Sequence, residues 1–429
     1  MQPGSQIITS KPARPSLALL WASRKKLLNS SWLVALVVLM AFGMWIFYFL
    51  RAGHDIRDFV YFGTNYLEQS SVSPFIKLDP KYAYLPDKIG YDGQFCYYLA
   101  VDPANARYYM DDANYRYTRI LYPMLARLVA LGQTEAVPYS LVAINWLALA
   151  GGTLAVAAWF KRKGKSPWLA LIFGLYPGFI ISLQRDLTEI LAYALVALAV
   201  YCFDFGGRRR VLWAGICFGL ACLARESVAV FPLFYALALL FIHQQPEGQK
   251  PRLNWGKASG FLVLALLPLG LYKLFLILWL GTLGLGAGAK LELIPLKGLL
   301  VYAPWQAGQV EQVRSVVVPA LICLGLGLLA LRQKLWQAEI WLMLANIILF
   351  VLMLPSWSYV DISASGRIAA GVVVAALFCL PRLEKLPGGV RNWFWVASGF
   401  WLSLSLFWLF VPLVNNSLDL LKGFFRPFR

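Results

Sequence analysis

The chain has 429 residues, of which 60% are hydrophobic and only 14% are charged, and its mean hydropathy is +0.63. A soluble domain could not cover so much apolar surface, so the composition excludes that class and predicts an all-α polytopic membrane protein. The formal net charge of +18 does not indicate nucleic acid, because the basic residues stand in short clusters between apolar segments.

Apolar segments predict about eleven transmembrane helices, since roughly 20 apolar residues cross a bilayer as a helix. They cover residues 31–50, 139–160, 167–183, 188–205, 211–224, 227–243, 258–285, 314–331, 338–354, 367–380 and 394–413. The mostly polar segment 1–30 is expected in the cytoplasm, and the span after it is long enough to remain as an anchor. Residues 31–429 are then expected to form one integral membrane domain.

With this topology, six basic clusters fall on the cytoplasmic side, as the positive-inside rule requires. The clusters are "SRKK" (23–26), "KRKGK" (161–165), "RRR" (208–210), "QKPR" (249–252), "RQK" (332–334) and "PRLEK" (381–385). Acidic residues concentrate on the opposite side, whereas the C-terminal tail "KGFFRPFR" is basic and departs from the rule. The expected location is a bacterial inner (plasma) membrane, with the functional residues on its extracytoplasmic side.

The first extracytoplasmic loop, residues 51–138, has about 90 residues, and loops of such length are usually functional or disordered. Within it, residues 116–132 carry an apolar stripe at helical spacing, which predicts a helix along the membrane surface. Arg116, Arg119 and Arg127 lie off that stripe, so we expect them to be available to lipid phosphate groups.

Asp92 is the first candidate for a general base in this loop, because Gly93 beside it allows a tight turn and close approach of a ligand or backbone. Asp55 and Asp58 are the competing catalytic candidates. Aromatic rings near Asp92 could exclude water and stack on a sugar; they belong to Tyr91, Phe95, Tyr97 and Tyr98. The plainer interpretation is an Asp-Gly turn in an interfacial aromatic belt.

Cofactor signals are weak. His54 beside Asp55 could help to hold a divalent cation, although a lone histidine is poor evidence for a metal. No Cys/His spacing indicates zinc and no glycine-rich loop indicates a nucleotide. An enzyme on this face would need another activated donor, and a polyprenyl-phosphate-linked sugar would arrive in the membrane plane.

Charged residues beside the spans form two further groups, and a charge in the bilayer costs about 2.5–3.5 kcal/mol, so each needs a reason. Where the fourth span begins, Arg185 and Glu189 are expected one turn apart on one helix face. Between the fifth and sixth spans, Arg225 and Glu226 are held near the bilayer boundary. An ion pair that fixes helix packing is the plain alternative for either group.

Together these groups suit a substrate that carries a phosphate and sugar hydroxyls. Arginine offers a permanent bidentate charge to phosphate, and a carboxylate can deprotonate a hydroxyl. Asp361 and Arg367 are expected on the same membrane face. The candidate substrate-binding residues are Tyr91, Gln94, Tyr97, Arg119, Arg185, Asp186, Glu189, Arg225 and Glu226.

The order of these motifs resembles the glycosyltransferase-C (GT-C) superfamily, polytopic enzymes with an essential acidic residue in a large first extracytoplasmic loop. "YDGQFCYYLAVDP" (91–103) and "RYTRILYP" (116–123) resemble the branch that contains the GPI-anchor mannosyltransferases. With "RDLTE" (185–189) and "LARES" (223–227), they are also similar to a group of bacterial membrane proteins. The resemblance covers roughly half of the chain.

This resemblance implies transfer of a sugar, with inversion, from a polyprenyl-phosphate donor to an extracytoplasmic glycan, lipid or protein acceptor. Asp92 would then be the essential acid. Tyr91 stands where the family has tryptophan, and residues 228–429 carry no motif that can be assigned. Two alternatives stay open: a transporter or flippase of a lipid-linked or anionic substrate, which Lys273 within a span favours, and a non-catalytic envelope partner.

Overall fold

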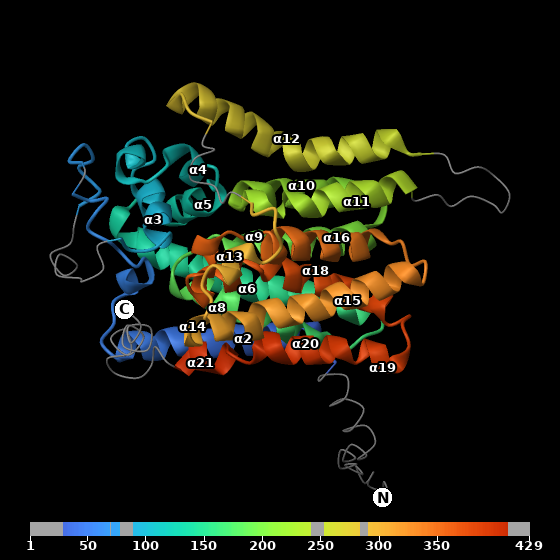
Figure 1. Ribbon diagram of the computed structural model, residues 1–429. Helices are drawn as coiled ribbons and strands as arrows, with labels where there is room; N and C mark the ends of the chain where they lie inside the picture. Colours follow the sequence, from blue (N-terminus) through green and yellow to red (C-terminus); the bar gives the residue numbers. More distant parts are fainter. Residues whose placement is uncertain (1–28, 69, 78–88, 242–252, 284–290, 411–429) are drawn as a thin grey trace, which may run out of the picture.

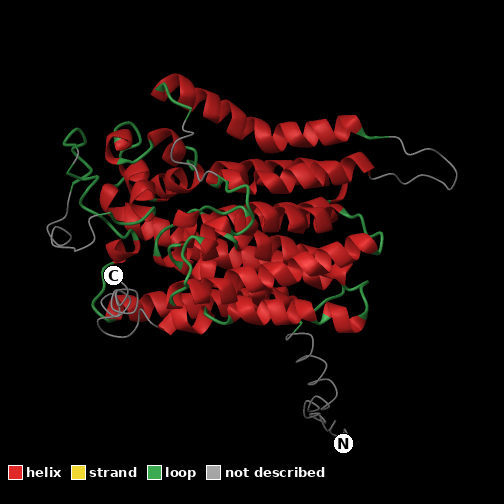
Figure 2. Cartoon of the chain, in the orientation of Figure 1, coloured by secondary structure: helices red, strands yellow, loops and turns green. Residues whose placement is uncertain are grey.

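The computed structural model describes residues 29–68, 70–77, 89–241, 253–283 and 291–410, and within these ranges it contains helices and loops but no strand. Figure 1 shows the long helices side by side with roughly parallel axes, while α3, α4 and α5 gather at one end of the bundle. Figure 2 shows the loops concentrated at the two ends of the helices. The predicted all-α fold is therefore confirmed for the described residues.

Among the residues that the structure describes, five helices are long and apolar enough to cross a membrane. They are Ser31–Arg51 (α2), Thr134–Arg162 (mainly α6, Val137–Arg162), Trp255–Leu280 (α12), Ala307–Arg332 (α14, Ala307–Gln312, to α15, Val318–Arg332) and Ile362–Leu383 (α17, Ile362–Ile368, with α18, Ala370–Leu383). This count indicates an integral membrane protein.

Two bent helix pairs could raise the number of spans to seven. In the first, Pro167–Gly174 (ending in α7, Leu171–Gly174) and α8 (Pro177–Gln184) meet at 51°, at a proline that cannot donate a backbone hydrogen bond. In the second, α9 (Glu189–Phe205) and Gly207–Ala224 (mainly α10, Arg210–Ala224) meet at 120°, and Gly207 has φ +61°.

The other apolar segments form shorter helices. Two of them are Glu226–Leu240, which includes most of α11 (Val230–Phe241), and Ala338–Leu352, which begins with α16 (Ala338–Ile347). Outside the first loop, the described residues also form the α-helices α13 (Lys297–Leu300), α19 (Gly388–Arg391), α20 (Trp393–Leu402) and α21 (Ser405–Phe410). Each predicted span overlaps a helix, but the count of about eleven spans stays a prediction.

The bundle has a buried centre and an exposed edge. In the most apolar part of α17 and α18, 83% of the residues are buried, whereas the figure for α12 is 17%. Figure 1 accordingly shows α12 at the edge of the bundle, beside α10 and α11. An apolar helix that exposes this much surface is suited to contact with lipid.

The basic clusters that the structure describes lie at the end of the bundle away from α3 to α5. Lys163 pairs with Asp204 at 2.7 Å, Lys165 pairs with Glu384, and Arg382 pairs with Glu339 at 3.1 Å. These contacts bring clusters from distant parts of the sequence together, as the predicted topology requires. The clusters at 23–26 and 249–252, most of segment 1–30 and the C-terminal tail lie outside the described residues.

The large first loop contains α3 (Gly93–Val101), α4 (Ala113–Tyr117) and α5 (Leu121–Val129). The single surface helix expected over 116–132 is therefore wrong, because the chain turns at residues 118–120 and divides it into α4 and α5. Arg127 also differs from expectation, since its Nη1 donates to the carbonyl oxygens of Ala100 and Val101 at 2.9 and 2.7 Å.

Candidate functional site

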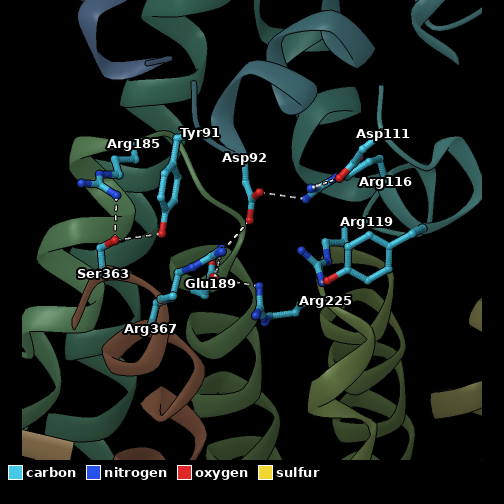
Figure 3. Close-up of polar contacts among 12 residues, drawn as sticks. Tyr91, Asp92, Asp111, Arg116, Arg119, Arg185, Glu189, Arg225, Ser363 and Arg367 are labelled. Carbon is cyan, nitrogen blue, oxygen red and sulfur yellow. Dashed lines mark hydrogen bonds and ion pairs between the residues drawn. The ribbon is translucent and has the colours of Figure 1, made fainter. Parts of the chain in front are cut away.

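Asp92 precedes α3, but its carboxylate does not cap that helix. Instead, Oδ1 accepts a hydrogen bond from Arg116 Nη1 at 2.9 Å and Oδ2 accepts one from Arg367 Nη2 at 2.5 Å (Figure 3). The two arginines come from α4 and α17, far apart in the sequence. The interpretation of residues 92–93 as a plain Asp-Gly turn is therefore incomplete, because the Asp92 carboxylate also connects the loop to the bundle.

Gly93 explains how Asp92 reaches this position. A Cβ atom on residue 93 would lie 2.1 Å from the backbone oxygen of Arg185, at the end of α8. Real Cβ atoms do not approach that closely, so only glycine fits between the loop and this backbone. The expected reason for glycine at this position is confirmed.

An alternating series of charges extends from Asp92 in both directions. Arg116 also donates Nη2 and Nε to the two oxygens of Asp111, at 2.7 and 2.8 Å. On the other side, Arg367 Nη1 donates to Glu189 Oε1 at 3.0 Å, and Arg225 Nη1 lies 2.7 Å from the same oxygen. The members of this charge network are Asp111, Arg116, Asp92, Arg367, Glu189 and Arg225.

The pairings within the two predicted charge groups are wrong. Glu189 begins α9 and is fully buried, but Arg185 ends α8 before a turn and does not share a helix face with it. Arg225 pairs with Glu189, whereas Glu226 pairs with Arg119, whose Nε and Nη2 donate at 3.0 and 2.7 Å. Arg119 and Arg116 thus point toward carboxylates rather than toward lipid phosphate.

Arg185 differs from the other arginines of the site, Arg116, Arg119, Arg225 and Arg367, because no described carboxylate forms an ion pair with it. Its Nη1 donates to Ser363 Oγ at 2.8 Å, and its guanidinium lies 4.1 Å from the centre of the Tyr91 ring. Tyr91 and Ser363 share a hydrogen bond of 3.1 Å, and Ser363 in turn contacts Asp361, which caps α17. Arg185 therefore retains charge that an anionic ligand could take up.

Electrostatics hold Asp92 in its ionised form. Burial would raise the pKa of this carboxyl, but the guanidiniums of Arg116, Arg367 and Arg119 lower the pKa well below its usual range. The pKa of Arg116 is raised in return, because the effect of Asp92 and Asp111 outweighs that of burial. Asp92 cannot act as a base while both of its oxygens are occupied in this way.

A cavity of about 20 Å³ lies among these side chains, which is space for a single water molecule. Its lining residues are Asp92, Phe95, Cys96, Leu99, Arg116, Arg119, Leu187, Thr188, Glu189 and Arg367. Thr188 Oγ1 and Glu189 Oε2 are buried and have no hydrogen-bond partner in the described part of the chain. A water molecule in the cavity would satisfy such atoms, but a sugar would not fit without movement of the side chains.

Two of the predicted binding residues, Gln94 and Tyr97, support the loop and do not line the cavity. Gln94 is buried and braces the loop, since Oε1 accepts from Gly63 N at 3.1 Å and Nε2 donates to Ile89 O at 2.8 Å. The Tyr97 ring packs edge-on against Phe62, with centroids 5.1 Å apart. These two side chains support the loop rather than the candidate site.

Asp186 is also separate from the charge network. It has a positive φ of 48° and is fully buried, and among the described residues its Oδ1 accepts only a long 3.4 Å hydrogen bond, from the Tyr122 hydroxyl. Burial raises the pKa of this carboxyl well above its ordinary value, with the Tyr122 hydrogen bond opposing the change. The expectation that Asp186 contributes to the site does not fit this geometry.

Asp55 and Asp58 hold the turn that follows α2. Asp55 Oδ1 accepts from the backbone N of Arg57, and Asp58 Oδ2 accepts from the backbone N of Asp55, each at 2.8 Å. Such reciprocal capping engages both carboxylates. Neither residue lines the cavity, and the described residues contain no group of three or more His, Cys, Asp or Glu suited to a metal. The residues around His54 therefore do not fit a divalent cation.

Arg116, Asp111 and Ser363 were absent from the predicted site. Arg367 was expected on the same membrane face but was not predicted to bind a substrate. The signal for Arg367 was an arginine within an apolar segment, which requires a partner. Arg116 carried no such signal, because an exposed loop arginine is ordinary. Its partner could be found only from the fold.

Fold and site together define a helical membrane protein with a partly buried arginine–carboxylate network at one end of its bundle. Comparison of the chain with known family models, with curated proteins and with solved structures finds no match.

Proposed function

We propose that the protein is a membrane glycosyltransferase that moves a sugar from a polyprenyl-phosphate-linked donor to an acceptor on the extracytoplasmic side. The observation that carries the proposal is a carboxylate, Asp92, held by Arg116 and Arg367 at the end of the bundle that faces away from the basic clusters (Figure 3). The GT-C-like order of motifs supports the same function.

In this mechanism, the acceptor hydroxyl gives its proton to Asp92 while its oxygen attacks the anomeric carbon of the donor. The bond between that carbon and the phosphate oxygen breaks, and polyprenyl phosphate leaves. Arg185 is the first choice to bind this phosphate because no described carboxylate neutralises it. Arg225, the second arginine expected to bind phosphate, is instead occupied by Glu189.

Binding of the donor would also activate the base. Arg367 contacts both Asp92 and Glu189, so a phosphate that attracts its guanidinium would leave Asp92 with fewer cationic partners. The pKa of Asp92 would then rise toward the range in which it can accept a proton. The closed cavity would thus correspond to the donor-free state.

The test is transfer by the purified full-length protein in lipid nanodiscs, supplied with radiolabelled polyprenyl-phosphate mannose or polyprenyl-phosphate glucose and an envelope extract as acceptor. Asp92→Asn should abolish product, a loss of at least about 100-fold, but retain donor binding. Asp58→Asn is the matched control and should retain transfer. Full transfer by Asp92→Asn would rule out Asp92 as the base.

The alternative of a transporter or flippase rests mainly on Lys273, whose contacts give it less support than they give the transferase. Lys273 Nζ donates to Asn114 Oδ1 in α4 at 2.7 Å, so this lysine ties α12 to the loop rather than lining a path through the bundle. Movement of the lipid-linked sugar across liposomes without any glycosidic product would favour the transporter. A protein that shows neither activity would fit a non-catalytic envelope partner.

A further inference from the structure

A second, larger pocket lies between the loop and the end of α12. Its volume is about 950 Å³, within the range of sites that bind small molecules. The lining residues are Arg107, Tyr108, Asp111, Asp112, Ala113, Asn114, Trp279, Leu280, Gly281, Thr282 and Leu283. None of them was predicted to bind a substrate, and none lines the small cavity at Asp92.

The two walls of this pocket are fixed to each other. Asn114 is buried, and its Nδ2 donates to the backbone oxygen of Thr282 at 2.6 Å while its Oδ1 accepts from Lys273 at 2.7 Å. The rings of Tyr117 and Trp279 also pack edge-on with centroids 5.2 Å apart. The pocket is therefore preformed, which reduces the cost of ordering it around a ligand.

The lining combines flat rings with charged groups of both signs. The Arg107 guanidinium lies 4.8 Å from the Tyr108 ring centre and 5.4 Å from that of Trp279, and Arg107 Nη2 donates to the Tyr108 hydroxyl at 2.8 Å. Asp111 and Asp112, which precede α4, also line the pocket. Such a lining offers hydrogen-bond acceptors, donors and apolar faces within one pocket.

We infer that this pocket binds a neutral carbohydrate. Sugar hydroxyls can donate to the carboxylates and accept from the guanidinium, while the C–H faces of the sugar ring pack on the aromatic side chains. A phosphate would meet two carboxylates and only one arginine, Arg107. A quaternary amine would have to displace Arg107 from the ring faces. The neutral, hydroxyl-rich ligand fits this charge pattern better than either ion.

One residue joins the pocket to the site at Asp92. Asp111 lines the pocket and holds Arg116 at 2.7 Å, and Arg116 holds Asp92 at 2.9 Å. A sugar bound beside Asp111 would thus lie two side chains from the proposed base. On the proposed function, from which this role follows, the pocket binds a non-reacting sugar unit of the acceptor glycan, another unit of which brings the reacting hydroxyl to Asp92, whereas the donor occupies the side of Arg185.

Binding can be measured without transfer, by saturation-transfer NMR on the full-length protein in lipid nanodiscs. The probes are methyl α-mannopyranoside, methyl α-glucopyranoside, methyl β-galactopyranoside and N-acetylglucosamine, with glycerol 3-phosphate and choline as ionic comparisons. At least one neutral sugar should bind, and Tyr108→Ala and Asp112→Asn should each weaken it about tenfold. Asparagine retains the cap of α4 that Asp112 provides, so the second variant should fold.

Tyr139→Ala is the matched control, because Tyr139 is an exposed tyrosine at the start of α6, outside the pocket. The inference is overturned if no neutral sugar binds, if either ion binds in preference, or if Tyr108→Ala leaves sugar binding unchanged. Sugar binding that persists in Asp92→Asn protein without any transfer activity would remove the proposed function and retain the pocket. If the protein transfers sugar and Tyr108→Ala leaves the KM for the acceptor unchanged, the proposed function is retained and the role of the pocket in acceptor binding is removed.

Discussion

At the scale of residues, Arg185 and Arg225 look alike in sequence but contact different kinds of groups. Arg225 pairs with Glu189, a fully buried carboxylate, whereas Arg185 contacts a serine hydroxyl and a tyrosine ring. We expect Arg225→Gln to destabilise the fold by about 3 kcal/mol, because it removes a partner from a buried charge. Arg185→Gln should cost less than about 1 kcal/mol yet weaken donor binding.

Unfolding of both variants in mixed detergent micelles, titrated with SDS, measures this difference, and binding of radiolabelled polyprenyl-phosphate sugar measures the second effect. Equal stabilities of the two variants would contradict the assignment. The sequence indicates arginines that need partners, but it cannot pair them. Arg225 finds its carboxylate 36 positions away, across a helix hairpin that only packing creates.

Asp186 makes stability depend on pH. Because its pKa is raised in the folded protein, the folded state binds more protons than the unfolded state once the pH exceeds about 4. Stability of the natural protein should therefore fall as the pH rises from about 4 toward the folded pKa. Asp186→Asn has no proton to lose, so its stability advantage should grow over the same range.

Melting temperatures of both proteins between pH 4 and pH 9 provide the test. Two parallel curves would show that Asp186 is already ionised in the folded state. Sequence analysis grouped Asp186 with its charged neighbours because they are adjacent in the chain. The left-handed backbone at Asp186, φ 48°, turns the side chain toward Tyr122 instead, and no local pattern indicates that turn.

At the scale of elements, the loop contacts the bundle at Gly93, where a Cβ atom would lie 2.1 Å from the Arg185 backbone oxygen. Gly93→Ala should therefore displace α3, destabilise the fold by at least about 2 kcal/mol and lower activity. Gly151→Ala is the matched control, because open space surrounds that position within α6. This control should be neutral or stabilising by up to about 1 kcal/mol.

Stability and transfer activity of the two alanine variants decide the matter, and equal behaviour would show that the loop can move away from α8 without cost. Hydropathy located the helices well because burial in lipid requires continuous apolar segments. It failed at residues 116–132, where the apolar stripe is continuous in sequence but the helix is interrupted at residues 118–120. Arg116 and Arg119 turn inward to reach Asp92 and Glu226, and these long-range partners divide the expected helix.

At the scale of the whole molecule, the two ends of the bundle differ in charge. The proposed topology places the end with the basic clusters in the cytoplasm and the end with the charge network outside it. In intact cells that carry Cys202→Ser, Ala104→Cys should react with a membrane-impermeant maleimide, whereas Arg209→Cys should react only after lysis. Both positions are exposed, and the other described native cysteines are buried. The opposite labelling pattern would place the network in the cytoplasm.

The charge network also constrains how the protein can change. Its six groups alternate in sign from Asp111 to Arg225, so they sum to zero and each internal member serves two neighbours. Removing one charged group leaves a net charge in the network and leaves its neighbours without a partner, whereas removing an adjacent acid and base together keeps the net charge at zero. Divergence along this series should therefore proceed by coupled exchanges, with paired replacements tolerated where either replacement alone is not.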